Sequence, residues 1–362
     1  MVKNVYIHIP FCKSKCKYCS FVSYTDLSLK DNYLDALECE IIQKYQGETL
    51  DTLYIGGGTP SLLKIDEIIR ILSLFTISNN TEITMELNPE SVNESYLKAL
   101  KTVGINRISF GIQTFNDSIL SSIGRRHDSK MAKEAVYNAR SAGFENISLD
   151  FIYGLPAQTI PDFMFDLKQG VALGVKHLSL YGLKIDEGCY FYRNFPKNLP
   201  DNDMQAEMYL KAIDFLEDKN FEHYEISNFS KQGFNSKHNL NYWNNNSYYG
   251  FGCAAHGYMN GIRYANNSDI EKYINEPCNV EYSHSLSPQE ILEEEIFLGL
   301  RKGEGINTKK INSKFNIEFD KKYSNILNKF LKSGHLIETE DGYKFSNNGF
   351  LISNTIMCEF LD

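Results

Sequence analysis

The chain has 362 residues, of which 42% are hydrophobic and 23% charged, and its formal net charge is −9. This length predicts about two domains. The acidic balance argues against nucleic acid as the main partner, because neutralising phosphates requires a basic surface. No apolar run reaches the roughly 18 residues of a membrane-spanning helix. The opening MVKNVYIHIP lacks the features of a signal peptide, so we expect a cytoplasmic protein.

Short β-branched runs alternate with amphipathic stretches in the first half of the chain. Strands are predicted at residues 5–9, 53–55, 83–87, 107–112, 147–152 and 177–183, and helices at residues 31–46, 65–75, 91–103, 130–142 and 160–173. Such alternation predicts parallel βαβ units with right-handed crossovers. We therefore expect an α/β fold, a partial parallel (β/α)6 barrel. An open doubly wound sheet is the alternative, and periodicity alone does not separate the two.

The alternation ends near Lys184, and the second half has a different texture. We expect a polar linker to Asp203, then a helix at 204–219, a strand at 221–226, loops with short strands at 227–268, helices at 289–300, 306–315 and 321–333, and a hairpin at 336–345. Helices followed by a hairpin indicate a helix-rich C-terminal domain with a winged-helix-like end. The glutamates of its first helix and the net charge argue against DNA binding. The predicted parts are residues 1–225, a barrel; 226–285, a connecting segment; and 286–362, the C-terminal domain.

Three of the eight cysteines, Cys12, Cys16 and Cys19, lie directly after the first predicted strand. In a reducing compartment such a cluster indicates metal binding or catalysis rather than disulfides. Thiolates suit zinc or an iron–sulfur cluster. Structural zinc prefers four ligands, often as two CxxC pairs, and the sequence has no second pair. Three ligands suit a [4Fe–4S] cluster whose fourth iron is open to a substrate or cofactor.

The cysteine loop and the strand ends that follow it resemble the radical S-adenosylmethionine (SAM) enzymes, and within them the anaerobic coproporphyrinogen III oxidase branch. In these enzymes the open iron chelates SAM, and one electron from the cluster yields a 5′-deoxyadenosyl radical. The matching segments are YIHIPFC at residues 6–12, GGGTP at 56–60, MELNP at 85–89, SFGIQTF at 109–115, GRRH at 124–127 and LDFIYGLP at 149–156.

This resemblance implies roles for individual residues. Cys12, Cys16 and Cys19 would ligate the [4Fe–4S] cluster. Glycines after a strand let backbone N–H groups approach a carboxylate closely, and a glutamate at a strand end suits a ribose hydroxyl. The implied SAM contacts are Tyr6, Tyr18, Gly57, Gly58, Thr59, Glu86, Gln113, Arg125 and Asp150.

Three departures separate the chain from the oxidases it resembles. Their fourth cysteine, two residues after the third, is replaced by Phe21. Their N-terminal extension has no counterpart before Cys12. The string HNLNYW at residues 238–243 fits the pattern HNxxYW, which is typical of the HemW heme chaperones; these resemble the oxidases but lack their decarboxylation activity.

The HNxxYW string implies heme contacts by His238, Asn239, Tyr242 and Trp243. Imidazole is a common axial ligand of heme iron, and tyrosine and tryptophan offer flat surfaces to a macrocycle. The alternative is a structural His238 beside a core Trp243, which is the only tryptophan of the chain. His256 and Cys253 are rival ligands, and His256 is also a candidate for contact with adenine.

The resulting hypothesis is a heme chaperone, rather than a coproporphyrinogen dehydrogenase, that binds heme, a [4Fe–4S] cluster and SAM and passes heme to an acceptor haemoprotein. The alternatives are oxygen-independent coproporphyrinogen III oxidation, in which propionate side chains are decarboxylated, and another tetrapyrrole-modifying radical SAM activity. Lys13, Lys15 and Lys17 form either a solvated loop or a docking patch for a flavodoxin- or ferredoxin-type electron donor. We expect neither a nucleic-acid partner nor a transmembrane segment; transient contact with a membrane protein is compatible with this hypothesis.

Overall fold

The computed structural model describes residues 2–361 and divides into two compact units. The first unit comprises residues 1–208 and 247–284, and the second comprises residues 209–246 and 285–362. The chain therefore leaves the first unit once and returns to it before the C-terminal segment begins. The three-part division at residues 225 and 285 stays a prediction.

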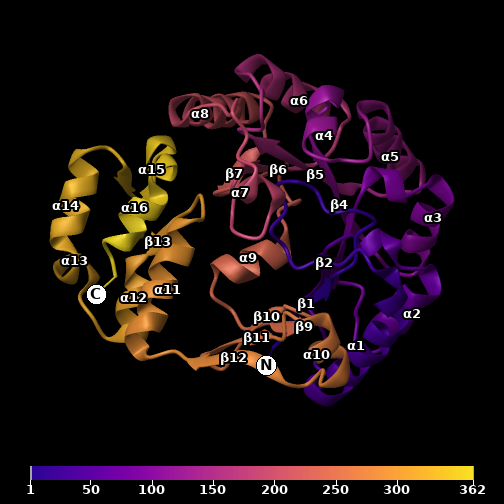
Figure 1. The fold of residues 1–362 in the computed structure, drawn as a ribbon. Coiled ribbons are helices and arrows are strands. Elements are labelled where there is room, and N and C mark those ends of the chain that lie inside the picture. Colours follow the sequence, from indigo (N-terminus) through magenta and orange to yellow (C-terminus); the bar gives the residue numbers. More distant parts are fainter. Residues whose placement is uncertain (1, 362) are drawn as a thin grey trace. The chain divides into compact units, whose positions relative to one another are not determined.

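The first unit is built on a parallel sheet with strand order β6-β5-β4-β3-β2-β1-β9. Every neighbouring pair in this series is parallel, and helices lie along the outside of the strands (Figure 1). The strands are β1 (Asn4–Ile9), β2 (Thr52–Gly57), β3 (Glu82–Leu87), β4 (Arg107–Gln113), β5 (Asn146–Tyr153), β6 (His177–Gly182) and β9 (Tyr249–Phe251); the helices are α1 (Lys30–Lys44), α2 (Ile65–Leu72), α3 (Glu94–Thr102), α4 (Asp117–Ser122), α5 (Ser129–Ser141), α6 (Ile160–Ala172) and α7 (Tyr190–Arg193).

The prediction of a partial parallel (β/α) barrel is confirmed. Strands such as β1 are buried on both faces, as expected for parallel strands covered by helices. Local signals begin the helices where the sequence indicates: Thr159 and Asp162 form a reciprocal cap at the start of α6, with Pro161 in its first turn. Because all strands run the same way, their carboxyl ends meet at one edge, where the segments carrying the predicted site residues follow.

A small antiparallel sheet completes the first unit. It consists of β10 (His256–Met259), β11 (Ile262–Asn266) and β12 (Val280–Ser285), with α10 (Ile270–Asn275) between the last two. The strands β10 and β11 agree with the prediction of short strands within residues 227–268, whereas α10 and β12 lie beyond that range.

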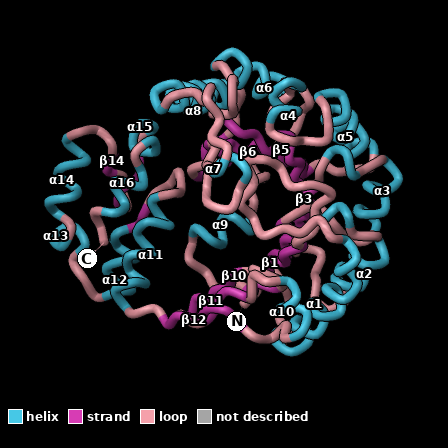
Figure 2. Tube along the Cα trace, in the orientation of Figure 1, coloured by secondary structure: helices cyan, strands magenta, loops and turns pink. Residues whose placement is uncertain are grey.

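The second unit is rich in helices gathered around the antiparallel sheet β13-β15-β14 (Figure 2). The predicted helices and C-terminal hairpin are thus confirmed. Its elements, including one helix that starts in the first unit, are α8 (Asn202–Asp218), β7 (Glu222–Glu225), β8 (Asn228–Ser230), α9 (Lys237–Trp243), α11 (Pro288–Leu300), β13 (Ile306–Asn307), α12 (Thr308–Phe315), α13 (Phe319–Lys322), α14 (Ser324–Lys332), β14 (Leu336–Glu338), β15 (Gly342–Phe345), α15 (Asn347–Leu351) and α16 (Ser353–Cys358).

One expectation for this unit is wrong. Residues 237–243 form a helix, α9, where loops and short strands are predicted. The asparagines in this segment are poor helix formers, which conceals the helix in the sequence. Ser236 begins it by accepting a hydrogen bond from the backbone N–H of Asn239, at 3.3 Å.

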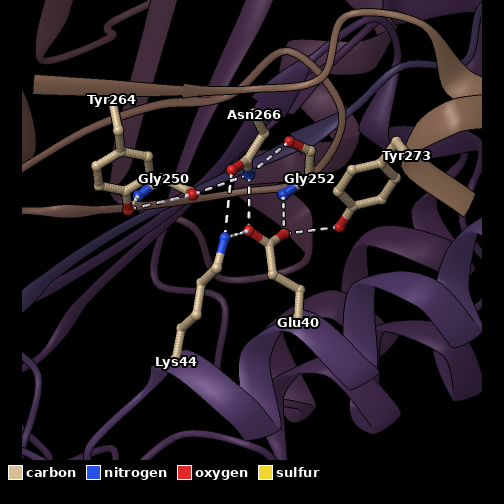
Figure 3. A network of polar contacts seen from close by, with 7 residues as sticks. All are labelled: Glu40, Lys44, Gly250, Gly252, Tyr264, Asn266 and Tyr273. Atoms are coloured by element: carbon tan, nitrogen blue, oxygen red, sulfur yellow. Dashed lines mark hydrogen bonds and ion pairs between the residues drawn. The ribbon is translucent and has the colours of Figure 1, made fainter. Parts of the chain in front are cut away.

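A buried carboxylate on α1 ties this helix to the segment after β9 (Figure 3). Glu40 has no exposed surface. Burial raises its pKa, and Lys44 opposes that rise. Its oxygens accept hydrogen bonds from the Gly252 backbone N–H at 2.8 Å, the Tyr273 hydroxyl at 2.7 Å, the Asn266 amide at 2.7 Å and the Lys44 ammonium at 2.8 Å. Glu40 thus fixes the backbone that leads from β9 to His256.

Among residues 2–361, no helix is both long enough and apolar enough to cross a membrane.

We expect Glu40→Ala to lower the free energy of unfolding by about 3–5 kcal/mol, because it leaves the half-buried Lys44 ammonium and the buried donors of Gly252, Asn266 and Tyr273 without their acceptor. Glu38→Ala on the same helix is the matched control, since its partner Arg70 is 41% exposed and such surface pairs contribute about 1 kcal/mol or less. Urea unfolding of both variants checks this. Equal losses would show that the Glu40 network does not stabilise the unit.

Candidate functional site

The loop that carries the three cysteines is held at both ends by backbone hydrogen bonds. Cys12 donates to the Tyr24 carbonyl at 3.0 Å, and Tyr24 donates back to the Pro10 carbonyl at 2.7 Å. Further along, Lys17 donates to the Ile123 carbonyl at 2.9 Å. These hydrogen bonds tie the loop to β1 at one end and to the end of α4 at the other.

The thiols of Cys12, Cys16 and Cys19 are free and half-buried. Burial raises the pKa of Cys12, and raises that of Cys19 to about 11. Within the described part of the chain, no three His, Cys, Asp or Glu side chains gather closely enough to hold a single metal ion. In a [4Fe–4S] cluster each cysteine thiolate would ligate a different iron, and the irons would lower the pKa of the thiols.

Glycines at the end of β2 bring the backbone against the cysteine loop. Gly57 has φ +115°, a conformation that favours glycine. A Cβ on Gly57 would lie 2.7 Å from Nδ1 of His8, and one on Gly58 would lie 2.7 Å from the Phe11 carbonyl oxygen. Both positions therefore require glycine, and the second brings the β2 turn directly against Cys12.

Glu86, at the end of β3, accepts hydrogen bonds from the neighbouring strand β2. Its Oε1 accepts from the Tyr54 hydroxyl at 2.8 Å and its Oε2 from the Gly57 N–H at 3.1 Å. Burial raises its pKa to about 7, although both hydrogen bonds oppose the shift. Each carboxylate oxygen keeps a second lone pair, so an additional hydroxyl donor can still be accepted.

Tyr6 lies beside this carboxylate on β1. Its hydroxyl and Nδ1 of His8 are 3.0 Å apart, and Nε2 of His8 is 2.9 Å from the Val22 carbonyl oxygen. Burial raises the pKa of Tyr6, and the charge of Glu86 raises it further. The sequence analysis does not identify His8 and Tyr54 as site residues. Both lie on strands that end at the site, and His8 is two residues from Tyr6, so the alternation of side chains along a strand could have indicated them.

Gln113, the last residue of β4, has a strained backbone conformation. Its φ of 68° is unusual for a residue with a side chain, and the register with β5 shifts there. The turn is held by Asp166 of α6, which accepts from the Phe115 N–H at 2.6 Å. Burial raises the pKa of Asp166 to about 7. Backbone strain of this kind is typical of binding sites.

Asp150, on β5, faces the neighbouring strand β4. Ser109 donates to both of its carboxylate oxygens, at 2.9 and 3.0 Å. Burial raises the pKa of Asp150, and the serine hydroxyls around it oppose that shift. The acidic position is thus hydrogen-bonded within the sheet.

Two predicted SAM residues contact the cysteines themselves. Thr59 donates its hydroxyl to Sγ of Cys12 at 3.4 Å, and Arg125 donates to Sγ of Cys16 at 3.6 Å. Burial opposes the charge of Arg125, but Tyr18 and Cys16 together raise the pKa of its guanidinium. The first unit therefore brings the three cysteines together with Tyr18, Thr59 and Arg125.

The predicted heme residues lie in the second unit, on α9. His238 is 1% exposed, and its Nε2 is 2.8 Å from the Tyr242 hydroxyl. The two rings meet edge to face with centroids 4.8 Å apart. His238 and Tyr242 are one helical turn apart, which explains their contact. Asn239 and Tyr242 are half-buried.

Trp243, at the end of α9, packs beside a buried carboxylate and a cation. The Arg301 guanidinium lies 5.5 Å from its ring centroid. Within the described residues, neither its indole nitrogen nor either carboxylate oxygen of Glu225 makes a close hydrogen bond. Burial raises the pKa of Glu225 to about 7, and the nearby Asn228 and Trp243 side chains oppose that shift.

The rival heme ligands lie in the first unit. Cys253 is buried and donates to the Ser268 carbonyl at 3.4 Å, and burial raises its pKa to about 12. His256 is exposed at the start of β10. Burial lowers the pKa of His8, and His256 contributes to that lowering.

Comparison with known proteins adds to this geometry. Residues 6–169 match the Radical SAM superfamily, and residues 286–352 match the HemN C-terminal domain. The heme chaperone HemW of Bacillus subtilis (strain 168) is 37% identical and covers 99% of both chains. HemW of Lactococcus lactis subsp. lactis (strain IL1403) is 36% identical, covering 99% of this chain and 97% of that protein.

A solved structure shares the fold. The coproporphyrinogen III oxidase HemN from Escherichia coli, described as a radical SAM enzyme, matches with a TM-score of 0.87 and 24% identity over 99% of this chain and 89% of that one. At this identity the likeness concerns the architecture, and it confirms the predicted fold class.

Anaerobically reconstituted protein is expected to hold about four iron and four sulfide per chain, because the three thiolates ligate three irons of a [4Fe–4S] cluster and leave the fourth iron open. Ala at Cys12, Cys16 or Cys19 is expected to remove most of the iron and the cluster absorbance. Cys39→Ala is the control, since Cys39 is exposed on α1. Equal loss of iron in Cys39→Ala would contradict the assignment.

Trp243 is expected to report the protonation of Glu225. Its emission, the only tryptophan signal of the chain, should change with a midpoint near pH 7, because the pKa of Glu225 is raised from 4.5 to about 7. Because the folded state holds the proton of Glu225 more tightly than the unfolded chain does, this proton contributes to the free energy of unfolding. The contribution is complete below pH 4.5 and falls as the pH rises to about 7. Glu225→Gln should abolish the fluorescence transition and flatten the stability profile; an unchanged transition would assign it to another group.

Proposed function

Because the chain belongs to the radical SAM superfamily and, within it, to the HemW family, we propose that it is a heme chaperone. It binds heme, a [4Fe–4S] cluster and SAM, and passes heme to an acceptor haemoprotein. The observation that carries this proposal is identity of 37% over 99% of both chains with a protein named heme chaperone HemW. The HNxxYW string on α9 supports it.

The first unit provides the cluster and SAM site of the proposal. Cys12, Cys16 and Cys19 hold the cluster on their pinned loop. When bound, the cluster can bind SAM at its open iron and supply it with one electron. The residues around the loop bind and orient SAM: Tyr6, Tyr18, Gly57, Gly58, Thr59, Glu86, Gln113, Arg125 and Asp150.

Two features of these residues support the assignment. The turn at Gly57 and Gly58 lies against Cys12, because a Cβ on Gly58 would be 3.0 Å from its Sγ, and both glycine N–H groups are held in place by hydrogen bonds to Glu86 and to the Ile9 carbonyl. Gln113 is held in a strained backbone conformation at the end of β4, with its amide nitrogen near Gly111 and Arg125. The strain fixes the direction of its side chain, which suits a residue that must meet a ligand.

The second unit provides the heme contacts. Trp243 and Tyr242 present aromatic surface for the macrocycle, and Asn239 is half-buried beside them. His238 is the proposed axial ligand. Since its Nε2 already pairs with the Tyr242 hydroxyl, ligation through that nitrogen requires Tyr242 to turn away. If His238 held the heme iron through Nε2, heme binding would be coupled to a movement of Tyr242.

The electron donor and the location complete the proposal. Lys13 and Lys15 are exposed on the cluster loop, whereas the Lys17 ammonium donates to the Ser122 carbonyl at 2.8 Å. The first two are positioned to attract an acidic flavodoxin- or ferredoxin-type donor. We place this activity in the cytoplasm, with transient contact to a membrane-bound acceptor.

Coproporphyrinogen III oxidation is the second candidate, favoured by the TM-score of 0.87 with HemN. The cysteine loop argues against it. The position of the oxidases' fourth cysteine is Phe21, whose side chain is 67% exposed and supplies no thiol. The relatives of higher identity are named heme chaperones, so the chaperone function is the better supported of the two.

Purified protein is expected to bind about one heme per chain. His238→Ala should shift the heme absorption band, because losing an axial imidazole changes the ligand field of the iron. Trp243→Phe should weaken binding a few-fold with little spectral shift, since it removes contact area but no ligand. Titration of each variant with heme, followed by absorbance, checks this.

His284→Ala is the matched control for His238, because His284 lies on β12 of the other unit. If His256→Ala or Cys253→Ala shifts the band while His238→Ala does not, the ligand assignment is wrong and the chaperone function stands. If no heme binds and coproporphyrinogen is decarboxylated anaerobically, the oxidase function replaces it.

A further inference from the structure

Two of the three cluster cysteines are joined through a chain of three polar side chains. Cys16 receives a hydrogen bond from the Arg125 guanidinium at 3.6 Å, and the same guanidinium donates to Oδ1 of Asn88 at 2.8 Å. The Asn88 amide nitrogen donates to the Thr59 hydroxyl at 3.1 Å, and Thr59 donates to Sγ of Cys12 at 3.4 Å. The path begins and ends on a cluster ligand.

The direction of each hydrogen bond in this chain is dictated by Arg125. A guanidinium has donors only, so the oxygen of the Asn88 amide must face Arg125 and its nitrogen must face Thr59. The Thr59 hydroxyl accepts from that nitrogen, and its single proton must then point to the sulfur of Cys12. The arrangement therefore delivers donors, and never acceptors, to both thiolates.

The relay is anchored to the scaffold on both sides. Arg125 also donates to the Gly111 carbonyl at 2.7 Å, and the Asn88 N–H donates to the Ser61 hydroxyl at 3.3 Å. Thr59 is 5% exposed. The three side chains come from the ends of β2 and β3 and from the turn after α4, so only the folded unit assembles them.

We propose that Asn88, Thr59 and Arg125 form a relay that positions Cys12 and Cys16 and raises the reduction potential of the cluster. Donors to the sulfurs stabilise the reduced cluster more than the oxidised one, because reduction adds negative charge. The half-buried surroundings of the loop strengthen this effect. The inference rests on the proposed cluster and assigns Asn88, which the sequence did not single out, as a positioning residue.

The relay is tested by redox titration of the cluster, followed by electron paramagnetic resonance without SAM. Thr59→Val keeps the shape and removes the donor. The ratio of reduced to oxidised cluster at a given potential should fall about tenfold, which is a midpoint about 59 mV more negative for one electron. Thr59→Ser, which keeps a hydroxyl, should restore the wild-type midpoint. Arg125→Met should shift the midpoint in the same direction and further, because it also removes a charge.

Asn88→Leu tests the connection between the two ends. It leaves every ligand and both sulfur donors in place, yet should lower the midpoint because Thr59 and Arg125 lose their orientation. Combined with Thr59→Val, its shift should be smaller than the sum of the single shifts, as expected for residues acting as a unit.

Thr84→Val is the matched control, since Thr84 is buried on β3 and its hydroxyl has no hydrogen-bond partner among the described residues. Its midpoint should equal that of the wild type. Iron and sulfide are counted first. Wild type without a cluster would contradict the proposed function, whereas full clusters with one common midpoint would overturn the relay alone. If Thr59→Val loses its cluster, the midpoint potential of Asn88→Leu tests the relay instead: a lower midpoint supports it, and the wild-type midpoint overturns it.

Discussion

Like charges cannot be gathered on one short loop unless the surroundings supply donors and positive charge. The site around Cys12, Cys16 and Cys19 meets this requirement from outside the loop, through Thr59 and Arg125. These residues stand at the ends of different βα units, so the parallel order of the strands is what brings them to the thiols. The site therefore depends on the register of the sheet as well as on the loop itself.

The same edge carries groups whose protonation is set by burial. Glu86 and Asp166 both have pKa values raised to about 7. Glu86 links β3 to β2 by accepting hydrogen bonds from Tyr54 and Gly57. Asp166 holds the strained turn at Gln113 by a hydrogen bond from the backbone that follows it. The carboxyl ends of the strands are thus held by hydrogen bonds to two carboxyl groups, one on β3 and one on α6, whose pKa values burial raises to about 7.

The alternation of strands and helices in the first unit could be predicted because its periodicity is strong, and the cysteine loop because its spacing is specific. Asn88 could not be found in this way: its role depends on Arg125 and Thr59, which are far from it in sequence and approach only in the folded sheet. The helix α9 was missed because asparagines weaken its helical signal, although Ser236 before it is a recognisable cap. The sequence left open whether His238 is a heme contact or a structural histidine, and the structure adds that its Nε2 lies 2.8 Å from the Tyr242 hydroxyl.

The central claim is that the protein delivers heme rather than transforming a porphyrinogen. It is tested most directly by mixing anaerobic, heme-loaded protein that carries its cluster with a heme-free b-type cytochrome and following the absorbance of the cytochrome. We predict that the cytochrome gains heme faster than it does from a heme-loaded protein of unrelated fold, with no carbon dioxide released when coproporphyrinogen III, SAM and a reductant are supplied instead. Failure to transfer heme, together with SAM-dependent release of carbon dioxide, would contradict the account.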